Sequence, residues 1–259
     1  MPTTHVNGRL IHYREWGEGE TNVIFVHGGF GSSANLWART AEALPPGVRA
    51  LAADMFLHSD PPPKGHSVEG IADHLADFAL AMGAAPATFV GHSMGGVVCQ
   101  LIGARRPEVV RQLVLVTTGP NVRNHGVALM LMDQLRERGR TRENMDEIAR
   151  HWFKTIPDRE AFERYVDDSM EAPLEAMLSV QQSLIDMDTT PELARITAPV
   201  LVTHGVHDHG RTMDHAERLM AGIPDARLAL FEESGHAPMW EEAPKFNETL
   251  HAFLRQPAA

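Results

Sequence analysis

Residues 91–95 read Gly-His-Ser-Met-Gly, a spacing in which a serine hydroxyl could act as a nucleophile. The pattern G-x-S-x-G occurs where a chain turns sharply from a strand into a helix and exposes the serine. Glycine on either side permits that bend, because it tolerates backbone conformations that other residues resist. The alternative is a polar turn that happens to contain glycines. The elements around Ser93 decide between the two.

The neighbours of Ser93 have the character of a strand and a helix. The apolar run ATFV at 87–90 precedes it, and GGVVCQLIGARR at 95–106 follows it. The start of such a helix directs its dipole and free N–H groups at the serine oxygen, where negative charge would develop. This context favours a nucleophile over an ordinary turn.

A serine hydroxyl needs a base to take its proton, and 15 histidines compete for that role. His236 is our candidate, because it follows the apolar run RLALF at 227–231, on the loop after the last predicted strand. We expect the bend to turn His92 away from the serine. His27, after the run VIFV, is expected to brace its own loop.

A third residue must orient the imidazole and stabilise its charged form. Asp208 follows the apolar run VLVTH and gives the chain order Ser93, Asp208, His236, which suits a G-x-S-x-G nucleophile. The alternative is a purely structural role, in which Asp208 is a loop aspartate that accepts hydrogen bonds from backbone amides. Asp54 is the weaker rival, because it precedes the serine in the chain.

Acyl transfer also needs hydrogen-bond donors for the oxyanion. The N–H of Met94, directly after the nucleophile, should be one of them. The second should come from the loop His-Gly-Gly-Phe at 27–30, from either Gly29 or Phe30. The sequence leaves these two residues as alternatives.

Composition excludes several other classes of function. The 259 residues are 43% hydrophobic and 22% charged, with a net charge of −11, which argues against nucleic acid or an anionic membrane as partner. The first residues lack the apolar core of a signal peptide, and no apolar run is long enough to span a bilayer. Cys99 is the single cysteine, so no disulfide can form within the chain, and we expect a cytoplasmic protein.

Metals and nucleotide cofactors have little support. His204, His207, Asp208 and His209 lie close together in sequence, yet His204 falls within a predicted strand and the spacing is not that of a hydrolytic zinc site. No glycine-rich phosphate loop follows any predicted strand. We therefore predict neither a metal nor a cofactor.

The apolar runs predict an α/β fold with a doubly wound, mostly parallel sheet. Continuous apolar runs of this length suit strands buried on both faces, and helical patterns separate them. Asn7-Gly8 predicts a hairpin turn near the start. Ser67 and Thr212 are expected to cap two of the helices, and Pro244 to open the last one. The predicted strands lie at 23–26, 48–53, 88–90, 113–117, 200–204 and 227–231.

The alternation stops between residues 121 and 190, where no strand-like run occurs. We expect residues 1–120 and 191–259 to form the core and residues 121–190 to form an all-helical lid over the carboxyl edge of the sheet, where ligands bind. The segment holds six methionines, and some of them should line an apolar pocket. Its four helices are expected near 126–138, 143–154, 158–170 and 173–186.

Four motifs resemble the α/β-hydrolase superfamily, in the type that carries a small helical lid. They are HGGF at 27–30, GHSMGG at 91–96, GVHD at 205–208 and SGHAPMWEEAPKFN at 234–247. The resemblance covers nearly the whole chain. One departure stands at residues 54–60, where the proline and glycines usual in these relatives are missing.

The resemblance implies a serine hydrolase without cofactors that cleaves small, fairly apolar esters or lactones through an acyl-enzyme. We expect Trp152, Phe153 and Trp240 to contact the substrate. Alternatives are a carbon–carbon bond hydrolase of ring-cleavage products, favoured by Trp240-Glu241, a receptor-like binder with slow turnover, and a perhydrolase. The expected partner is a small molecule, with neither nucleic acid nor membrane.

Overall fold

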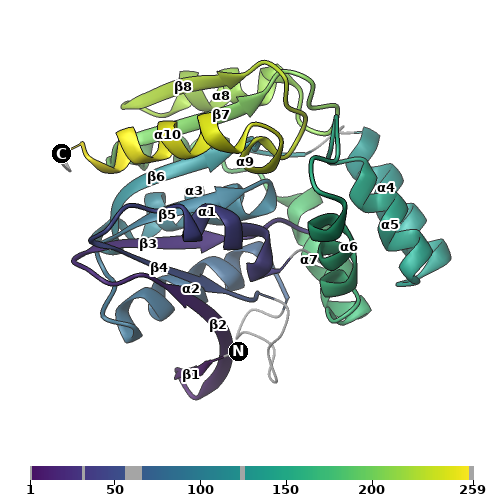
Figure 1. Ribbon diagram of the computed structural model, residues 1–259, viewed down its shortest axis with the longest axis horizontal. Coiled ribbons are helices and arrows are strands. Elements are labelled where there is room, and N and C mark those ends of the chain that lie inside the picture. The colour runs from purple at the N-terminus through teal and green to yellow at the C-terminus, as the bar shows by residue number, and fades with distance from the viewer. Residues whose placement is uncertain (1, 31–32, 56–65, 123–125, 257–259) are drawn as a thin grey trace.

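A mostly parallel eight-stranded sheet forms the centre of the protein (Figure 1). The computed structural model describes residues 2–30, 33–55, 66–122 and 126–256. The strand order in this part of the chain is β1-β2-β4-β3-β5-β6-β7-β8, parallel from β4 to β8, with β1 and β2 antiparallel at one edge. The strands are β1 Thr3–Val6, β2 Arg9–Trp16, β3 Thr21–Val26, β4 Val48–Ala53, β5 Ala87–His92, β6 Val110–Val116, β7 Val200–Gly205 and β8 Ala226–Phe231.

The predicted fold class and strands are confirmed. Strands β5 and β7 are buried along their whole length, which is why they read as unbroken apolar runs. The predicted hairpin is also present, since Asn7 and Gly8 both adopt positive φ, at 52° and 79°, between β1 and β2.

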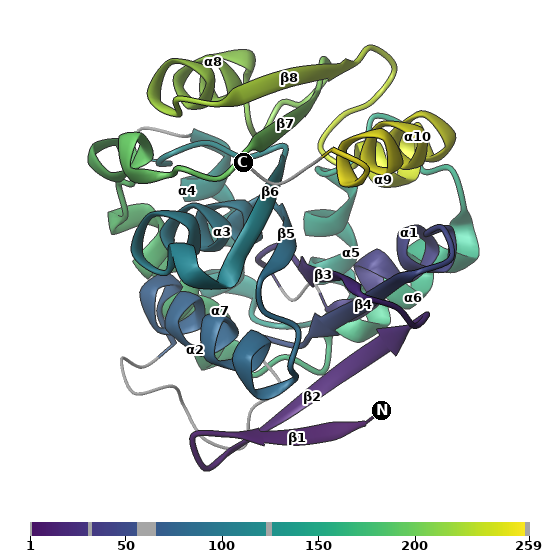
Figure 2. The same cartoon turned by 90° about the vertical axis from the view of Figure 1, so that its left-hand side faces the viewer.

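Helices cover both faces of the sheet. Figure 2 shows α2, α3 and α8 on one side, and α1 and α10 on the other. Ser67 caps α2 as predicted, by accepting the N–H of Gly70 at 3.0 Å. Thr212 precedes α8 but makes no cap, because its hydroxyl bonds the carboxylate of Asp214. These helices are α1 Ala38–Glu42, α2 Val68–Ala81, α3 Met94–Arg105, α8 Met213–Gly222, α9 Pro238–Glu241 and α10 Ala243–Leu254.

Four further helices lie between β6 and β7 in sequence and gather at one end of the sheet (Figure 1). We call α4–α7 the helical segment. Its role as a lid stays a prediction at this point. No helix in the described residues is long and apolar enough to cross a bilayer. The four are α4 Gly126–Arg138, α5 Arg142–Arg150, α6 Arg159–Ser169 and α7 Leu174–Asp186.

Candidate active site

Ser93 stands on a strained turn between β5 and α3. Its φ of 54° lies in the left-handed region, which non-glycine residues seldom adopt. The turn needs glycine for close approach, since a Cβ on Gly91 would lie 2.3 Å from the carbonyl oxygen of Gly95. A Cβ on Gly95 would lie 2.4 Å from the carbonyl oxygen of His27. The spacing of the motif is therefore dictated by backbone contact.

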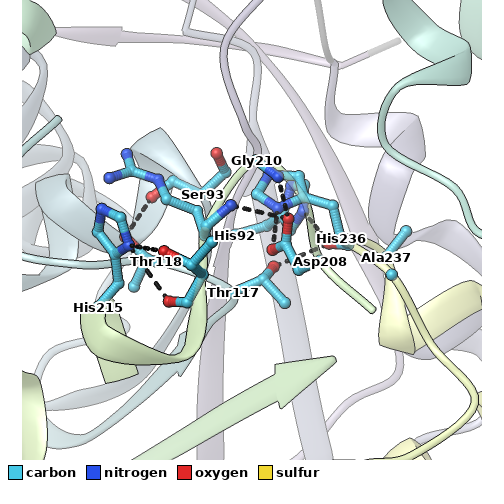
Figure 3. A network of polar contacts seen from close by, with 12 residues as sticks. His92, Ser93, Thr117, Thr118, Asp208, Gly210, His215, His236 and Ala237 are labelled. Carbon is cyan, nitrogen blue, oxygen red and sulfur yellow. Dashed lines mark hydrogen bonds and ion pairs between the residues drawn. The ribbon is translucent and has the colours of Figure 1, made fainter. Parts of the chain in front are cut away.

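His236 and Asp208 form a buried pair on two loops beyond the sheet (Figure 3). Nδ1 of His236 lies 2.6 Å from Oδ2 of Asp208. The carboxylate can only accept, so Nδ1 carries the proton and Nε2 keeps its lone pair. Oδ1 of Asp208 accepts the N–H groups of Gly210 and Arg211, each at 2.8 Å. An imidazole held in this tautomer can take a proton at Nε2.

The aspartate is held in its ionised form. Burial alone would raise the pKa of Asp208, but the neighbouring His236 and the hydrogen bonds that the carboxylate accepts lower it more strongly. Its pKa therefore lies below the usual 3.8. A carboxylate that stays ionised at neutral pH can stabilise an imidazolium beside it.

The backbone of His236 is fixed from both sides. Its N–H donates to the carbonyl of Trp152 at 3.0 Å, and its carbonyl accepts from Thr117 Oγ1 and His92 Nε2, each at 2.8 Å. The His92 ring packs against the candidate base, with its centroid 4.7 Å from that of His236, and its turning away from Ser93 stays a prediction. His92 braces the candidate base.

Ser93 and His236 line a single cavity, and the predicted oxyanion residues Gly29, Phe30 and Met94 line it too. The helical segment and its connections supply Val127, Ala128, Trp152, Tyr165, Gln181 and Leu184. No methionine of that segment is among the described lining residues, so the expected methionine wall is wrong. Branched, small and aromatic side chains take its place, together with the amide of Gln181.

Of the three predicted substrate contacts, only Trp152 is among the described residues that line this cavity. Phe153 and Trp240 instead pack against each other, with ring centroids 5.5 Å apart. The indole N–H of Trp240 donates to the carbonyl of Leu36 at 2.9 Å, which ties α9 to the core. Both residues therefore pack outside the described lining of the cavity.

Asp54, the rival acid, belongs to a different cluster. It accepts the N–H of Ala34 at 2.8 Å, and its carboxylate lies 3.9 Å from Nε2 of His27. Nε2 of His27 accepts the N–H of Met55, so this histidine braces its loop as expected. Burial raises the pKa of Asp54 to about 6. The rest of the unusual loop, 56–60, lies outside the described residues.

Two polar residues of the cavity escaped the sequence analysis. Arg211 is buried, and its Nη1 donates to the carbonyl of Asn121 at 2.9 Å. Burial lowers its pKa to about 10, so the guanidinium stays charged at neutral pH. Its place three residues after Asp208 was a usable signal. No feature of the sequence marked Gln181, which lies in the middle of α7.

Possible metal ligands are scattered over the part of the chain that the structure describes. Nowhere there do three or more histidine, cysteine or acidic side chains gather in a way that could hold an ion. His204 lies in β7 and is buried, as its place in a strand implied.

Two buried histidines should make stability fall in mild acid. Burial lowers the pKa of His27 to about 4 and that of His92 to about 3, from 6.5. Below pH 6.5 these two histidines are therefore protonated in the unfolded chain and still neutral in the folded protein. The free energy of unfolding falls as the pH falls toward 4. Asp54, with its raised pKa, opposes this between pH 6 and 3.8.

The variant His92→Asn should make the free energy of unfolding depend less on pH below 6.5. Asparagine takes up no proton in the unfolded chain, and it keeps a side-chain hydrogen-bond donor. For each pH unit below 6.5, the free energy of unfolding of the variant should become larger than that of wild type by about 1.4 kcal/mol. Urea unfolding at several pH values between 7.5 and 4.5 measures the slope. The exposed His5→Asn is the control. Equal slopes for wild type and His92→Asn would contradict the prediction.

Comparison with known protein families finds a match over most of the chain. The model of the alpha/beta hydrolase family matches residues 23–249. A 2-hydroxy-6-oxo-6-phenylhexa-2,4-dienoate hydrolase of Comamonas testosteroni is 31% identical over 271 residues, covering 95% of this chain and 92% of the relative.

Solved structures show the same fold. The enol-lactonase of Burkholderia xenovorans LB400 superposes with a TM-score of 0.87 at 24% identity, over 98% of this chain and all of that one. An esterase of Exiguobacterium antarcticum gives 0.85 at 22% identity, over 98% and 99% of the two chains. Because the family model matches most of the chain, the chain belongs to the alpha/beta hydrolase family.

Proposed function

We propose that the protein is a serine hydrolase that cleaves small carboxylic esters or lactones through an acyl-enzyme. Ser93 is the nucleophile, His236 the base and Asp208 the residue that orients and stabilises the imidazole. The observation that carries this proposal is the 2.6 Å His236–Asp208 hydrogen bond, set in the same cavity as a serine on a strained turn.

The reaction follows from these positions. Nε2 of His236 takes the proton of Ser93 as Oγ attacks the carbonyl carbon, and the N–H of Met94 with that of Gly29 or Phe30 holds the oxyanion. The intermediate collapses, and His236 returns the proton to the departing alcohol oxygen. Water then repeats the cycle on the acyl-enzyme, releases the acid and restores the free serine.

Carbon–carbon bond hydrolysis is the second candidate. The relative that is 31% identical acts on a dienoate with a ketone at carbon 6, and the same nucleophile and base could serve such a substrate. A structural neighbour is a meta-cleavage product hydrolase, at a TM-score of 0.82. The two candidates share the site and differ in the bond that breaks.

A panel of substrates tests the proposal. Chromogenic esters of graded chain length, a lactone and a ring-cleavage dienone would be assayed side by side. A burst of chromophore followed by steady turnover is expected for an acyl-enzyme. A burst with negligible turnover would indicate a slow binder instead, and bleaching of the dienone without ester cleavage would favour the second candidate.

We further propose that residues 121–190 act as a lid whose apolar side shapes an acyl pocket. Each buried CH₂ can contribute about 0.8 kcal/mol, so three added carbons could raise kcat/KM by roughly 50-fold before the pocket fills. We expect kcat/KM to rise from acetate to medium chains and then fall. Rates that are flat or fall from acetate onward would contradict the prediction.

A paired substitution locates the pocket. Leu184→Ala removes side-chain volume from the cavity wall and should move the optimum toward longer chains. Leu193→Ala is the matched control, because Leu193 is fully buried and is not among the described lining residues. It should lower the thermal midpoint and leave the optimum in place.

A further inference from the structure

Gln181 on α7 is a buried amide in the wall of the cavity. It is 2% exposed, and it lines the same cavity as Ser93 and His236. Its Nε2 finds no hydrogen-bond partner among the described residues. An amide donor enclosed in this way is destabilising, because it has given up its hydrogen bonds to water. A leucine of similar size would fill the space without that cost.

Gln181 can be compared with Gln100 on α3, which is 1% exposed. Nε2 of Gln100 donates to the carbonyl of Gly119 at 3.3 Å, and its Oε1 accepts from Thr189 at 2.6 Å. Gln100 is a satisfied structural glutamine. Gln181 keeps a donor unused in the cavity that holds the candidate nucleophile, which a structural role does not explain.

The amide of Gln181 sits directly on the candidate oxyanion loop. A Cβ built on Gly29 would lie 2.0 Å from Nε2 of Gln181, so a larger residue at position 29 would displace the amide from this place. Gly29 is absent from the described residues of positive φ, so its backbone conformation does not itself call for glycine. The sequence of the loop and the position of the amide are therefore matched.

Helix α7 holds the amide in place. Ser183 Oγ accepts the N–H of Val68 at 3.1 Å, at the start of α2, and Ser179 Oγ donates to the carbonyl of His66 at 3.0 Å. Two hydrogen bonds on the same helix as Gln181 thus tie it to the core. A donor positioned before the reaction needs no rearrangement when charge develops.

We propose that Gln181 is a catalytic residue whose side-chain amide donates a hydrogen bond to the substrate oxygen that becomes the oxyanion. This inference rests on the proposed function. The carbonyl oxygen is the acceptor that an ester, a lactone or a ketone would each bring to Ser93, and Gly29 borders the place where it must lie. The oxyanion is then held from two sides, by backbone N–H groups of the core and by an amide of the helical segment. The bond strengthens as the oxygen gains charge, so it lowers the barrier more than it tightens substrate binding.

The test separates activity from stability. Gln181→Leu should lower kcat by about 10²-fold, the usual effect of losing one oxyanion donor, with little change in KM. Its thermal midpoint should be unchanged or higher, because an unpaired buried donor is removed. Gln181→Glu keeps the shape, removes the donor when ionised and should lose still more activity. Gln100→Leu, the matched control, should lower the midpoint and keep the kcat of the folded enzyme.

Affinity for a boronic acid, which forms a tetrahedral adduct with a nucleophilic serine, gives a second measurement. It should weaken in Gln181→Leu in step with kcat/KM. Wild-type kcat in that variant, or a lower midpoint with kcat preserved in the folded fraction, would overturn this inference alone. A wild-type protein that turns over neither esters nor dienone and is not labelled at Ser93 by a fluorophosphonate would overturn the proposed function with it.

Discussion

Replacing Ser93 with alanine is expected to lower kcat by about 10⁴-fold or more, with the fold intact. The hydroxyl is the only group at the turn that can form the acyl-enzyme in the proposed mechanism. Alanine removes the oxygen and leaves the backbone, whose N–H donates to the carbonyl of Val116 at 2.9 Å. Rates with a chromogenic ester and circular dichroism would measure the two properties.

His236→Ala should produce a loss of similar size, and the double variant should be little worse than either single one, because the two residues act as a unit. A fluorophosphonate should label Ser93 in the wild type, as mass spectrometry would show. Ser169→Ala is the control, since Ser169 is also buried but bonds the carbonyl of Val166 within α6. A label on another serine, or wild-type rates in Ser93→Ala, would refute the assignment.

The strands could be predicted because a strand that is buried on both faces has a continuous apolar run in its sequence. Strand β7 consists of residues that are all buried, and its predicted bounds differ from the observed ones by a single residue. The hairpin at Asn7-Gly8 was equally legible, since a two-residue turn with positive φ demands such residues. Local chemistry decided these elements.

Side-chain directions could not be predicted in the same way. His92 adjoins Ser93 in sequence, yet where its ring points depends on the loop of His236, which is 144 residues away. Trp240 was expected at the substrate, but its indole N–H finds the carbonyl of Leu36 on another element. Thr212 failed as a cap because Asp214 competes for its hydroxyl. The contacts of His92 and Trp240 join residues far apart in the chain, which spacing does not encode.

Replacing Asp208 with asparagine should lower kcat by about 10⁴-fold with little change in thermal midpoint. One carboxylate oxygen accepts two backbone N–H groups, from Gly210 and Arg211, so the carbonyl oxygen of the asparagine should keep that place. Its NH₂ group would then face Nδ1 of His236 and donate to it. Nδ1 would lose its proton, Nε2 would carry it, and the imidazole could no longer accept the proton of Ser93.

Asp54→Asn is the matched comparison for this prediction. Asp54 is also a buried aspartate that accepts a backbone N–H, from Ala34, but it lies beside His27 rather than His236. Because its pKa is raised to about 6, the ionised form is disfavoured in the folded protein, and a neutral asparagine should preserve or raise stability at pH 7. We expect kcat within a few-fold of wild type, on the order of an ordinary supporting residue. Chromogenic-ester kinetics and thermal unfolding of both variants decide between the two acids. A large loss of kcat in Asp54→Asn, with Asp208→Asn near wild type, would transfer the role to Asp54.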